Sequence, residues 1–446
     1  MLLVDALRED FVEFDTKAHQ YLDPKNPFIY SGRKLKLFKE AVETFPERAV
    51  LFPFSSEIPT VTAVRVKSML TGGVATSFDV TSEFGSSENK EDNILYQLKN
   101  RKGKVPTIAQ YGDRVWPDQF GQFFDRHEWY DATNVRDLES FDLGSTSALY
   151  KELEESDFSL LIGHVLGVDS AGHAFHSGHP EIERKLRDAE EVIHQVIEKM
   201  DEKTTLLVFG DHGMTGDGNH GGGSELELRS VLFAYQKTPF PLADAYKRYR
   251  DTFEDMDKTV KQVDLAAIMC QLLDIPIPFS NLGVFHPIFA QTSDVAQIHA
   301  AFLQNLEQQE SYLKEYCKVT SQEWCTEEID SFHKSLSKFR KLRPSRASEQ
   351  DLLDHIDLMH EFANEKYAYF ATIWTEFNDF SFYVGIALGV WLFVFHVAVS
   401  FELSNYEQDS LALATVGIVF ALYGAAFMNI VPFEFVAALA VAVTMQ

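Results

Sequence analysis

One strand–helix–strand unit in the middle of the chain restricts the folds that this sequence can adopt. Two apolar runs, residues 159–166 and 204–209, have the pattern of buried strands. The segment between them contains Pro180, a residue suited to a first helical turn, followed by apolar residues at helical spacing. A helix that connects two strands of one sheet makes them parallel, and ligands bind beyond the carboxyl ends of parallel strands. The sequence therefore predicts an α/β fold with its functional site at that edge.

Other segments extend this pattern on both sides. The apolar runs 2–4, 49–52 and 107–111 predict further strands, which gives a parallel-rich sheet flanked by helices over residues 1–290. Residues 291–379 lack Gly and are rich in Glu, Gln, Lys and Leu, so we expect a helical linker region of two or three amphipathic helices, broken near Pro344.

Two uncharged apolar segments follow the helical region. Residues 380–401 and 411–431 contain no Asp, Glu, Lys or Arg, and each is long enough to cross a hydrocarbon core of about 30 Å as a helix. We predict a transmembrane region over 380–446, with a partial third span from 435; a pair of buried core helices is the alternative. Since a strand begins at residue 2 and the third apolar run meets the chain end, we expect further sequence at both ends.

Aromatic side chains are concentrated just before the first apolar segment. They predict an interfacial aromatic belt, and a plain core helix is the competing interpretation. The residues are Tyr367, Tyr369, Phe370, Trp374 and Phe377.

Charge and cysteine content restrict the function and the compartment. The formal net charge is −27, from 40 Lys+Arg and 67 Asp+Glu. A nucleic-acid binder needs a basic face, so we expect no nucleic-acid partner. Cys270 lies in an apolar stretch and is predicted to be core. Cys317 and Cys325 either form a disulfide in an oxidising compartment or remain two free thiols.

Carboxylates and imidazoles follow the predicted strands. Asp5 ends the first strand, Asp169 and His173 follow the strand 159–166, and Asp211, His212 and His220 follow the strand 204–209. Three carboxylates and three imidazoles exceed the four ligands of one tetrahedral zinc. Two divalent metal ions, about 3.5–4 Å apart and sharing a phosphoryl group, use the whole set. The three imidazoles favour zinc, with manganese as the alternative.

The segment Pro59-Thr60-Val61-Thr62 contains the candidate nucleophiles. Metal coordination lowers the pKa of a threonine hydroxyl and so activates it. Two dications offset three aspartates and one alkoxide, and this neutral balance suits a singly charged phosphodiester better than a dianionic monoester. On these grounds alone, Thr60 and Thr62 are both open.

Five segments together resemble the GPI ethanolamine phosphate transferases of the alkaline phosphatase superfamily. They occur in the family's order, and the run at 210–224 is most similar to the type that modifies the third mannose. The segments are residues 4–8, 59–72, 164–173, 210–224 and 263–283. The resemblance implies an alkaline-phosphatase-like catalytic domain over residues 1–290.

The resemblance also implies roles for individual residues. One metal would be held by Asp5, Thr62, Asp211 and His212. The other would be held by Asp169, His173 and His220. Thr62 would be the nucleophile, because the superfamily's nucleophile stands ten residues before the Gly that Gly72 matches. Arg8 and His164 match the motifs and are expected to support the site from behind the metal ligands.

The implied activity is transfer of phosphoethanolamine from phosphatidylethanolamine to a mannose, the third by preference, of the GPI-anchor precursor. A covalent phosphoethanolamine–threonine intermediate would form on the way. The resemblance places such an enzyme in the endoplasmic reticulum membrane with its catalytic domain lumenal, and a small membrane partner subunit is a further candidate partner.

Three alternatives accompany this prediction. A zinc phosphodiesterase or another hydrolase of the same superfamily would use water where the transferase uses a sugar hydroxyl. A sulfatase needs Cys or Ser at the nucleophile position, which is occupied here by Thr62. A non-enzymatic membrane protein with a relic domain is disfavoured because all seven proposed ligands are present.

Overall fold

The computed structural model describes residues 1–14, 26–74, 88–155, 157–241, 259–320, 322, 324–375, 389 and 391. Residues Met1–Ala371 form one compact unit, and Thr372–Gln446 form a second. Of the predicted membrane region, only residues 389 and 391 are described, so the spans 380–401 and 411–431 and the run from 435 otherwise lie outside the described residues. Within the described part, no helix has both the length and the hydropathy of a membrane span.

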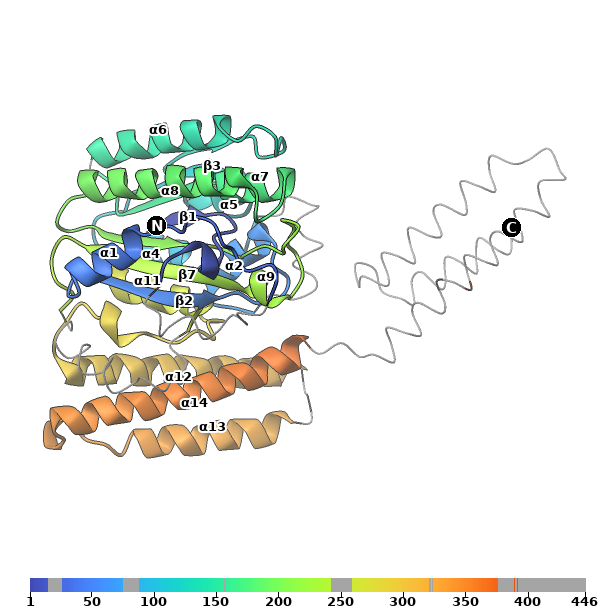
Figure 1. Cartoon of the computed structure of the whole chain (residues 1–446). Coiled ribbons are helices and arrows are strands. Elements are labelled where there is room, and N and C mark those ends of the chain that lie inside the picture. The colour runs from blue at the N-terminus through green and yellow to red at the C-terminus, as the bar shows by residue number, and fades with distance from the viewer. Residues whose placement is uncertain are drawn as a thin grey trace. The chain divides into compact units, whose positions relative to one another are not determined.

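An eight-stranded mixed sheet forms the centre of the first unit (Figure 1). The strands lie in the order β4-β3-β5-β1-β6-β7-β2-β8. All neighbours are parallel except that β7 runs antiparallel to both β6 and β2. The bounds are β1 Leu2–Val4, β2 Ala49–Ser55, β3 Ile108–Asp113, β4 Arg126–Tyr130, β5 Leu160–Val165, β6 Thr205–Phe209, β7 Arg229–Gln236 and β8 Val260–Lys261.

The predicted α/β class is confirmed, and each of the five predicted strands is present. Strands β4, β7 and β8 were not predicted. The side chains of β4 are exposed or half-buried, so this edge strand carries no apolar run that a sequence pattern can detect. β7 makes the sheet mixed, because the chain returns beside β6 without a crossover helix.

Helices cover both faces of the sheet (Figure 1). On β1, Leu2 and Val4 point into one core and Leu3 into the other, as strand geometry requires. The first core includes residues of α1 (Leu37–Thr44), α6 (Ser140–Glu155), α7 (Gly167–Ala174) and α8 (Pro180–Lys199). The second core includes residues of α2 (Thr62–Thr71), α4 (Ile94–Lys99), α5 (Val115–Phe120) and α11 (Asp264–Leu273).

Three helices follow the sheet region: α12 (Val295–Thr320), α13 (Cys325–Phe339) and α14 (Glu349–Thr375). Pro344 lies in a 3-10 turn between α13 and α14, where the break was predicted. A disulfide joins Cys317 to Cys325, and Cys270 is buried in α11. A third core packs these helices against residues 284–290. The domain boundaries drawn from the sequence at 290 and 379 stay predictions.

The aromatic residues of α14 are divided between the core and the surface. Tyr367 and Phe370 are 8% and 2% exposed, so the core-helix alternative describes these two side chains. Tyr369 is 38% exposed. The side chains of Trp374 and Phe377 lie outside those described.

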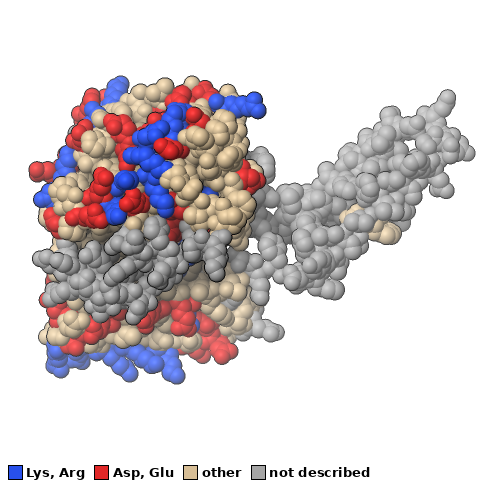
Figure 2. Space-filling model, in the orientation of Figure 1, with Lys and Arg blue, Asp and Glu red and all other residues tan. Residues whose placement is uncertain are grey.

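The surface over α8 carries both signs of charge, as the face seen in Figure 2 shows. Arg184 pairs with Glu139 at 2.6 Å, and Arg187 pairs with Glu183 at 2.6 Å. Exposed pairs of this kind contribute little to stability, about 0–1 kcal/mol each. The surface over α8 is therefore a solvated helical surface on which charges of both signs lie side by side.

Candidate active site

The predicted ligands converge at the carboxyl edge of three adjacent strands. β5, β1 and β6 are neighbours and run parallel, so the residues after their ends share one edge. Asp5 follows β1, and Asp169 and His173 lie on α7, directly after β5. Asp211 and His212 follow β6.

The first group consists of Asp5, Asp211 and His212, all of which are buried. The Nε2 atom of His212 lies 3.2 Å from Oδ2 of Asp211 and 3.6 Å from Oδ1 of Asp5. The hydroxyl of Thr62 lies 3.3 Å from the same Nε2 atom. These three ligand candidates and the threonine therefore surround one small volume.

The second group consists of Asp169, His173 and His220. The Nε2 atoms of His173 and His220 lie 3.5 Å and 3.4 Å from Oδ1 of Asp169 and 3.0 Å from each other. Asp169 and His173 are four residues apart and share one face of α7. The rings of His212 and His220 stack with centroids 3.9 Å apart, so the two groups are adjacent.

Backbone carbonyls fix the tautomers of two histidines. His212 Nδ1 lies 2.8 Å from the carbonyl oxygen of Gly213, and His220 Nδ1 lies 2.7 Å from that of Thr60. A carbonyl only accepts, so each Nδ1 carries the proton and donates it. Each Nε2 atom is then left with its lone pair directed into its group. This is how metal-binding histidines are commonly oriented.

The electrostatics of both groups fit divalent cations. Burial, followed by the charges of Asp211 and Asp169, raises the pKa of Asp5 well above its usual range. Burial lowers the pKa of His220, but the hydrogen bond to Asp169 and the charge of its carboxylate raise that pKa to about 9, so the position at Nε2 favours a cation, either a proton or a metal ion. Clustered buried carboxylates are costly unless a cation neutralises them.

Unpartnered oxygens give a second test of this fit. Oδ1 of Asp5, Oδ1 of Asp169 and Oδ2 of Asp211 are buried without a hydrogen-bond partner among the described residues. Buried polar atoms are otherwise almost always satisfied, and hard oxygen ligands are what divalent metals bind. Each of the two groups supplies at least one such oxygen, so the residues fit a two-metal site.

The two threonines have different environments. The hydroxyl of Thr60 donates to the carbonyl of Gly222 at 2.9 Å and accepts from the N–H of Gly221 at 2.8 Å, so Thr60 is occupied in holding a loop. Thr62 is the first residue of α2, and its hydroxyl faces His212. A helix amino terminus also favours negative charge. The geometry therefore favours Thr62 over Thr60 as the candidate nucleophile.

Asp5 is held by two residues behind the site. Trp116 Nε1, which can only donate, lies 3.2 Å from His164 Nδ1. His164 therefore carries its proton on Nε2, which donates to Oδ2 of Asp5 at 2.9 Å. The supporting position predicted for His164 agrees with this contact, whereas Trp116 was not predicted. It lies far from the site residues in the sequence and follows no polar strand-end pattern.

Glu227 and Arg8 shape the loops around the site. Glu227 accepts from the N–H groups of Gly222 and Ser224 at 2.7 Å and 3.0 Å and so fixes the loop that carries His220. Sequence reasoning missed this role, although the spacing of Ser224 and Glu227 is that of a capping box. Arg8 pairs with Asp10 at 2.6 Å and also donates to two backbone carbonyls. Arg8 therefore stabilises the loop after β1, and none of these contacts is to a candidate metal ligand.

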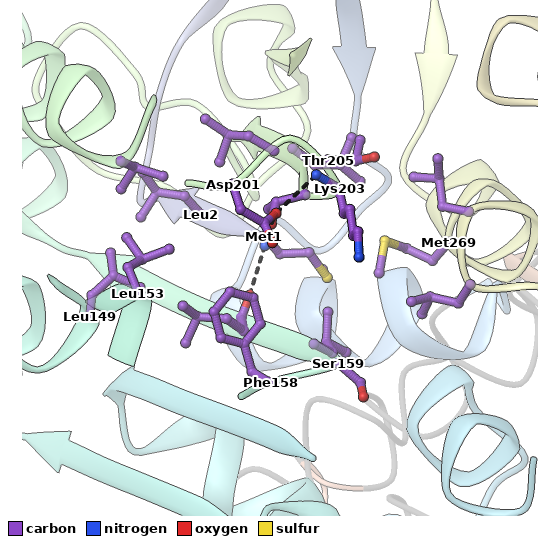
Figure 3. A pocket seen from close by; sticks show the side chains of 18 residues that line it. Met1, Leu2, Leu149, Leu153, Phe158, Ser159, Asp201, Lys203, Thr205 and Met269 are labelled. Carbon is purple, nitrogen blue, oxygen red and sulfur yellow. Dashed lines mark hydrogen bonds between the residues drawn. The ribbon is translucent and has the colours of Figure 1, made fainter. Parts of the chain in front are cut away.

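A cavity of about 310 Å³ lies at the opposite, amino-terminal edge of the same strands (Figure 3). Its walls include Leu2, Leu149, Phe158 and Met269, together with Lys203 and Asp201. None of the predicted metal ligands lines it. The chemistry proposed for this chain therefore belongs to the carboxyl edge.

One family model and several solved structures are similar to parts of this chain. Residues 106–218 match the family model of Type I phosphodiesterase / nucleotide pyrophosphatase. Among solved structures, the soluble domain of lipooligosaccharide phosphoethanolamine transferase A from Neisseria meningitidis matches with a TM-score of 0.42 and 13% identity, over 66% of this chain and 90% of that chain.

Sequence relatives then give the family. GPI ethanolamine phosphate transferase 3, catalytic subunit, from Homo sapiens is 34% identical over 72% of this chain and 29% of its own length. GPI ethanolamine phosphate transferase 3 from Schizosaccharomyces pombe is 29% identical over 87% of this chain and 38% of its own length. The chain is therefore a homologue of the GPI ethanolamine phosphate transferases, as its motifs predicted. It spans 29–38% of the length of these two relatives.

Proposed function

We propose that this chain carries the catalytic part of a metal-dependent phosphoethanolamine transferase. The position of the Thr62 hydroxyl, 3.3 Å from His212 and beside two carboxylate–imidazole groups, supports this proposal most directly. Asp5, Asp211 and His212, with Thr62, would hold one ion, and Asp169, His173 and His220 the other. Two bound divalent ions, zinc by preference, would supply Lewis-acid stabilisation of the charge on the transferring phosphoryl group.

In the first step, the Thr62 oxygen would form a bond to the phosphorus of phosphatidylethanolamine. The bond from phosphorus to the glycerol oxygen would break, and diacylglycerol would leave with the proton. In the second step, the oxygen of a mannose hydroxyl of the GPI precursor would form a bond to the same phosphorus, the bond to Thr62 would break, and the hydroxyl proton would return to the Thr62 oxygen. The position of Thr62 at the first turn of α2 favours the developing negative charge in both steps.

The acceptor and the compartment are parts of the same proposal. The human and fission-yeast relatives are both named GPI ethanolamine phosphate transferase 3, and the run at residues 210–224 resembles the type that modifies the third mannose, so we propose the third mannose as acceptor. The disulfide between Cys317 and Cys325 supports an oxidising compartment. We therefore propose a lumenal catalytic domain at the endoplasmic reticulum membrane. A small membrane partner subunit stays a prediction.

Hydrolysis is the second candidate, and the match of residues 106–218 to a phosphodiesterase model favours it. Water would then attack the Thr62 adduct and release free phosphoethanolamine. The two candidates share the first step and differ only in the second.

Labelled phosphatidylethanolamine separates the candidates. The whole chain is incubated with vesicles that contain lipid labelled in its ethanolamine group, with and without a GPI intermediate. A transferase moves the label to the glycolipid, whereas a phosphodiesterase releases it as free phosphoethanolamine in both conditions. Thr62→Ser should retain some labelling of the enzyme. Full transfer by Thr62→Ala would show that Thr62 is not the nucleophile, and no reaction of the wild-type chain would reject both candidates.

A further inference from the structure

A tyrosine of α14 contacts the segment that leads to Thr62. The hydroxyl of Tyr367 donates to Oε1 of Glu57 at 2.5 Å. The Tyr367 side chain is buried, and the ammonium of Lys261 lies 5.0 Å from its ring centroid. Lys261 also donates to Asn364, which lies about one turn earlier on α14. Contacts from two different elements thus fix the position of this tyrosine.

The second oxygen of Glu57 holds α2. Nη1 of Arg65 donates to Oε2 of Glu57 at 2.5 Å, and the Arg65 side chain is fully buried. Nε and Nη2 of Arg65 have no hydrogen-bond partner among the described residues, so Glu57 is the anion that compensates this buried charge. Arg65 stands three residues after Thr62, on the neighbouring turn of the same helix. Glu57 therefore links α14 to the helix that presents Thr62.

The segment held by Glu57 positions both halves of the site. At its start, the N–H of Ser56 donates to the carbonyl of Leu228 at 2.9 Å. At its end, the carbonyl of Thr60 accepts from His220 at 2.7 Å, and Thr62 begins α2. These hydrogen bonds restrict the conformation of the short segment from Ser56 to Thr62. A displacement of Glu57 would be transmitted to the hydroxyl of Thr62 and to the imidazole of His220.

We propose that Tyr367 is a positioning residue for the reaction at Thr62, acting through Glu57 and Arg65. It touches neither the substrate nor the ligand groups. The inference rests on the proposed function and adds to it, because it makes the last turns of α14 part of the machinery that sets the nucleophile's geometry. In the sequence, α14 is followed by residues 380–401, the first predicted membrane span.

Single-turnover labelling of Thr62 tests this proposal. The whole chain, with its bound metals, is mixed with vesicles of phosphatidylethanolamine labelled in the ethanolamine group, and the rate of adduct formation is measured against lipid concentration. Tyr367→Phe removes one hydroxyl and keeps the ring. We expect the saturating rate to fall about tenfold, because small displacements of a reacting group are costly, while the half-saturating lipid concentration stays unchanged.

Tyr369→Phe is the matched control. It makes the same substitution two residues away on the same helix, at a side chain that is 38% exposed and makes no contact with Glu57 that the structure shows. Its labelling rate should equal that of the wild-type chain. Metal content and the midpoint of thermal unfolding are measured for every variant, because a merely structural role would change these properties and leave the rate per folded, metal-bound molecule intact.

Glu57→Gln provides the second variant. It should slow labelling at least as much as Tyr367→Phe, and the double variant should be no slower than Glu57→Gln alone, because residues that act through one link are not additive. Wild-type rates per folded, metal-bound molecule in Tyr367→Phe, or in Glu57→Gln if the former does not fold, would overturn the positioning role. Additive losses would overturn the link through Glu57. An unlabelled wild-type chain would instead reject the proposed function.

Discussion

The imidazole of His164 donates its Nε2 proton to Oδ2 of Asp5 over 2.9 Å, and this contact leaves Oδ1 of Asp5 as the oxygen that faces His212. His164 is in β5 and Asp5 follows β1, so the bond ties the ends of two parallel strands together. Trp116 holds the other nitrogen of His164 and fixes its tautomer. The orientation of Asp5, a candidate metal ligand, thus depends on Trp116, which contacts it only through His164.

Replacement of His164 should weaken metal binding without removing a ligand. We expect His164→Phe to lower the affinity of one of the two metal sites by about 10–100-fold, the range typical for partners behind metal ligands. Isothermal titration calorimetry of the metal-free chain with zinc measures this change in affinity. His194→Gln, at an exposed histidine of α8, is the control. Unchanged affinity in His164→Phe would show that Asp5 needs no support from His164.

Each of the two ligand groups should hold its own metal ion, so disruption of one group should remove one ion. We expect about two ions per wild-type chain and about one in Asp169→Asn, because the group of Asp5, Asp211 and His212 stays complete. Elemental analysis of the purified protein measures both values. Asp131→Asn, on an exposed loop, should leave the count at two. Fewer than one ion per wild-type chain would favour a relic domain over an enzyme.

Thr60 should matter for stability, while Thr62 should matter for the reaction. Thr60→Val removes the hydroxyl that partners the N–H of Gly221 and the carbonyl of Gly222 in a half-buried loop, which should lower the free energy of unfolding by about 0.5–1.5 kcal/mol per hydrogen bond. Thr62→Val removes a single contact of 3.3 Å and should cost less. Urea denaturation of both variants measures the difference. A larger loss in Thr62→Val would reverse the structural assignment of the two residues.

The disulfide between Cys317 and Cys325 should stabilise the junction of α12 and α13. The two residues are eight apart, and closing a loop of this size stabilises a fold by about 2–3 kcal/mol in the chain-entropy account. We expect Cys317→Ser/Cys325→Ser to unfold at lower urea concentration than the oxidised chain. Dithiothreitol should lower the midpoint of the wild-type chain and leave that of the double variant unchanged. An equal response of both proteins would show that the bond does not contribute.

Two partly buried histidines should make the fold sensitive to acid. Burial, then the charge of Lys261, lowers the pKa of His360 to about 4, and burial lowers that of His286 to about 3. In the unfolded chain both titrate near 6.5. Their contribution is therefore fully present above about pH 6.5, and it is lost as the pH falls toward 4, by about 1.4 kcal/mol per pH unit for each histidine.

Urea unfolding at pH 7, 6 and 5 measures this slope. His360→Gln keeps a group that can accept from Asn364, as Nδ1 of His360 does, and has no titrating ring. The loss of stability between pH 7 and pH 5 should be smaller in this variant than in the wild-type chain. His194→Gln, at a half-exposed histidine of α8, is the control. Identical slopes for His360→Gln and the wild-type chain would contradict the prediction.

The amino-acid sequence alone was enough to predict the α/β class, five of the strands and the location of the candidate ligands after the ends of strands. Each of these features is local: a strand is an apolar run, and Asp169 or His212 stands directly after one. Because parallel strands end at a common edge, the strand pattern also predicted that these side chains would come together. The family motifs added Thr62, which no local pattern separates from Thr60.

Only the tertiary structure decided the features that depend on distant partners. Trp116 orients His164, Glu227 holds the loop of His220, and Tyr367 is buried against Glu57. The same is true of the antiparallel β7 and of the bond between Cys317 and Cys325. A hydrogen bond or a strand pairing depends on where two segments meet in space, and hydrophobic periodicity reports only which side of one segment is buried. The sequence by itself therefore determined which groups are candidates for the chemistry, and the packing of distant segments decided how those groups are oriented.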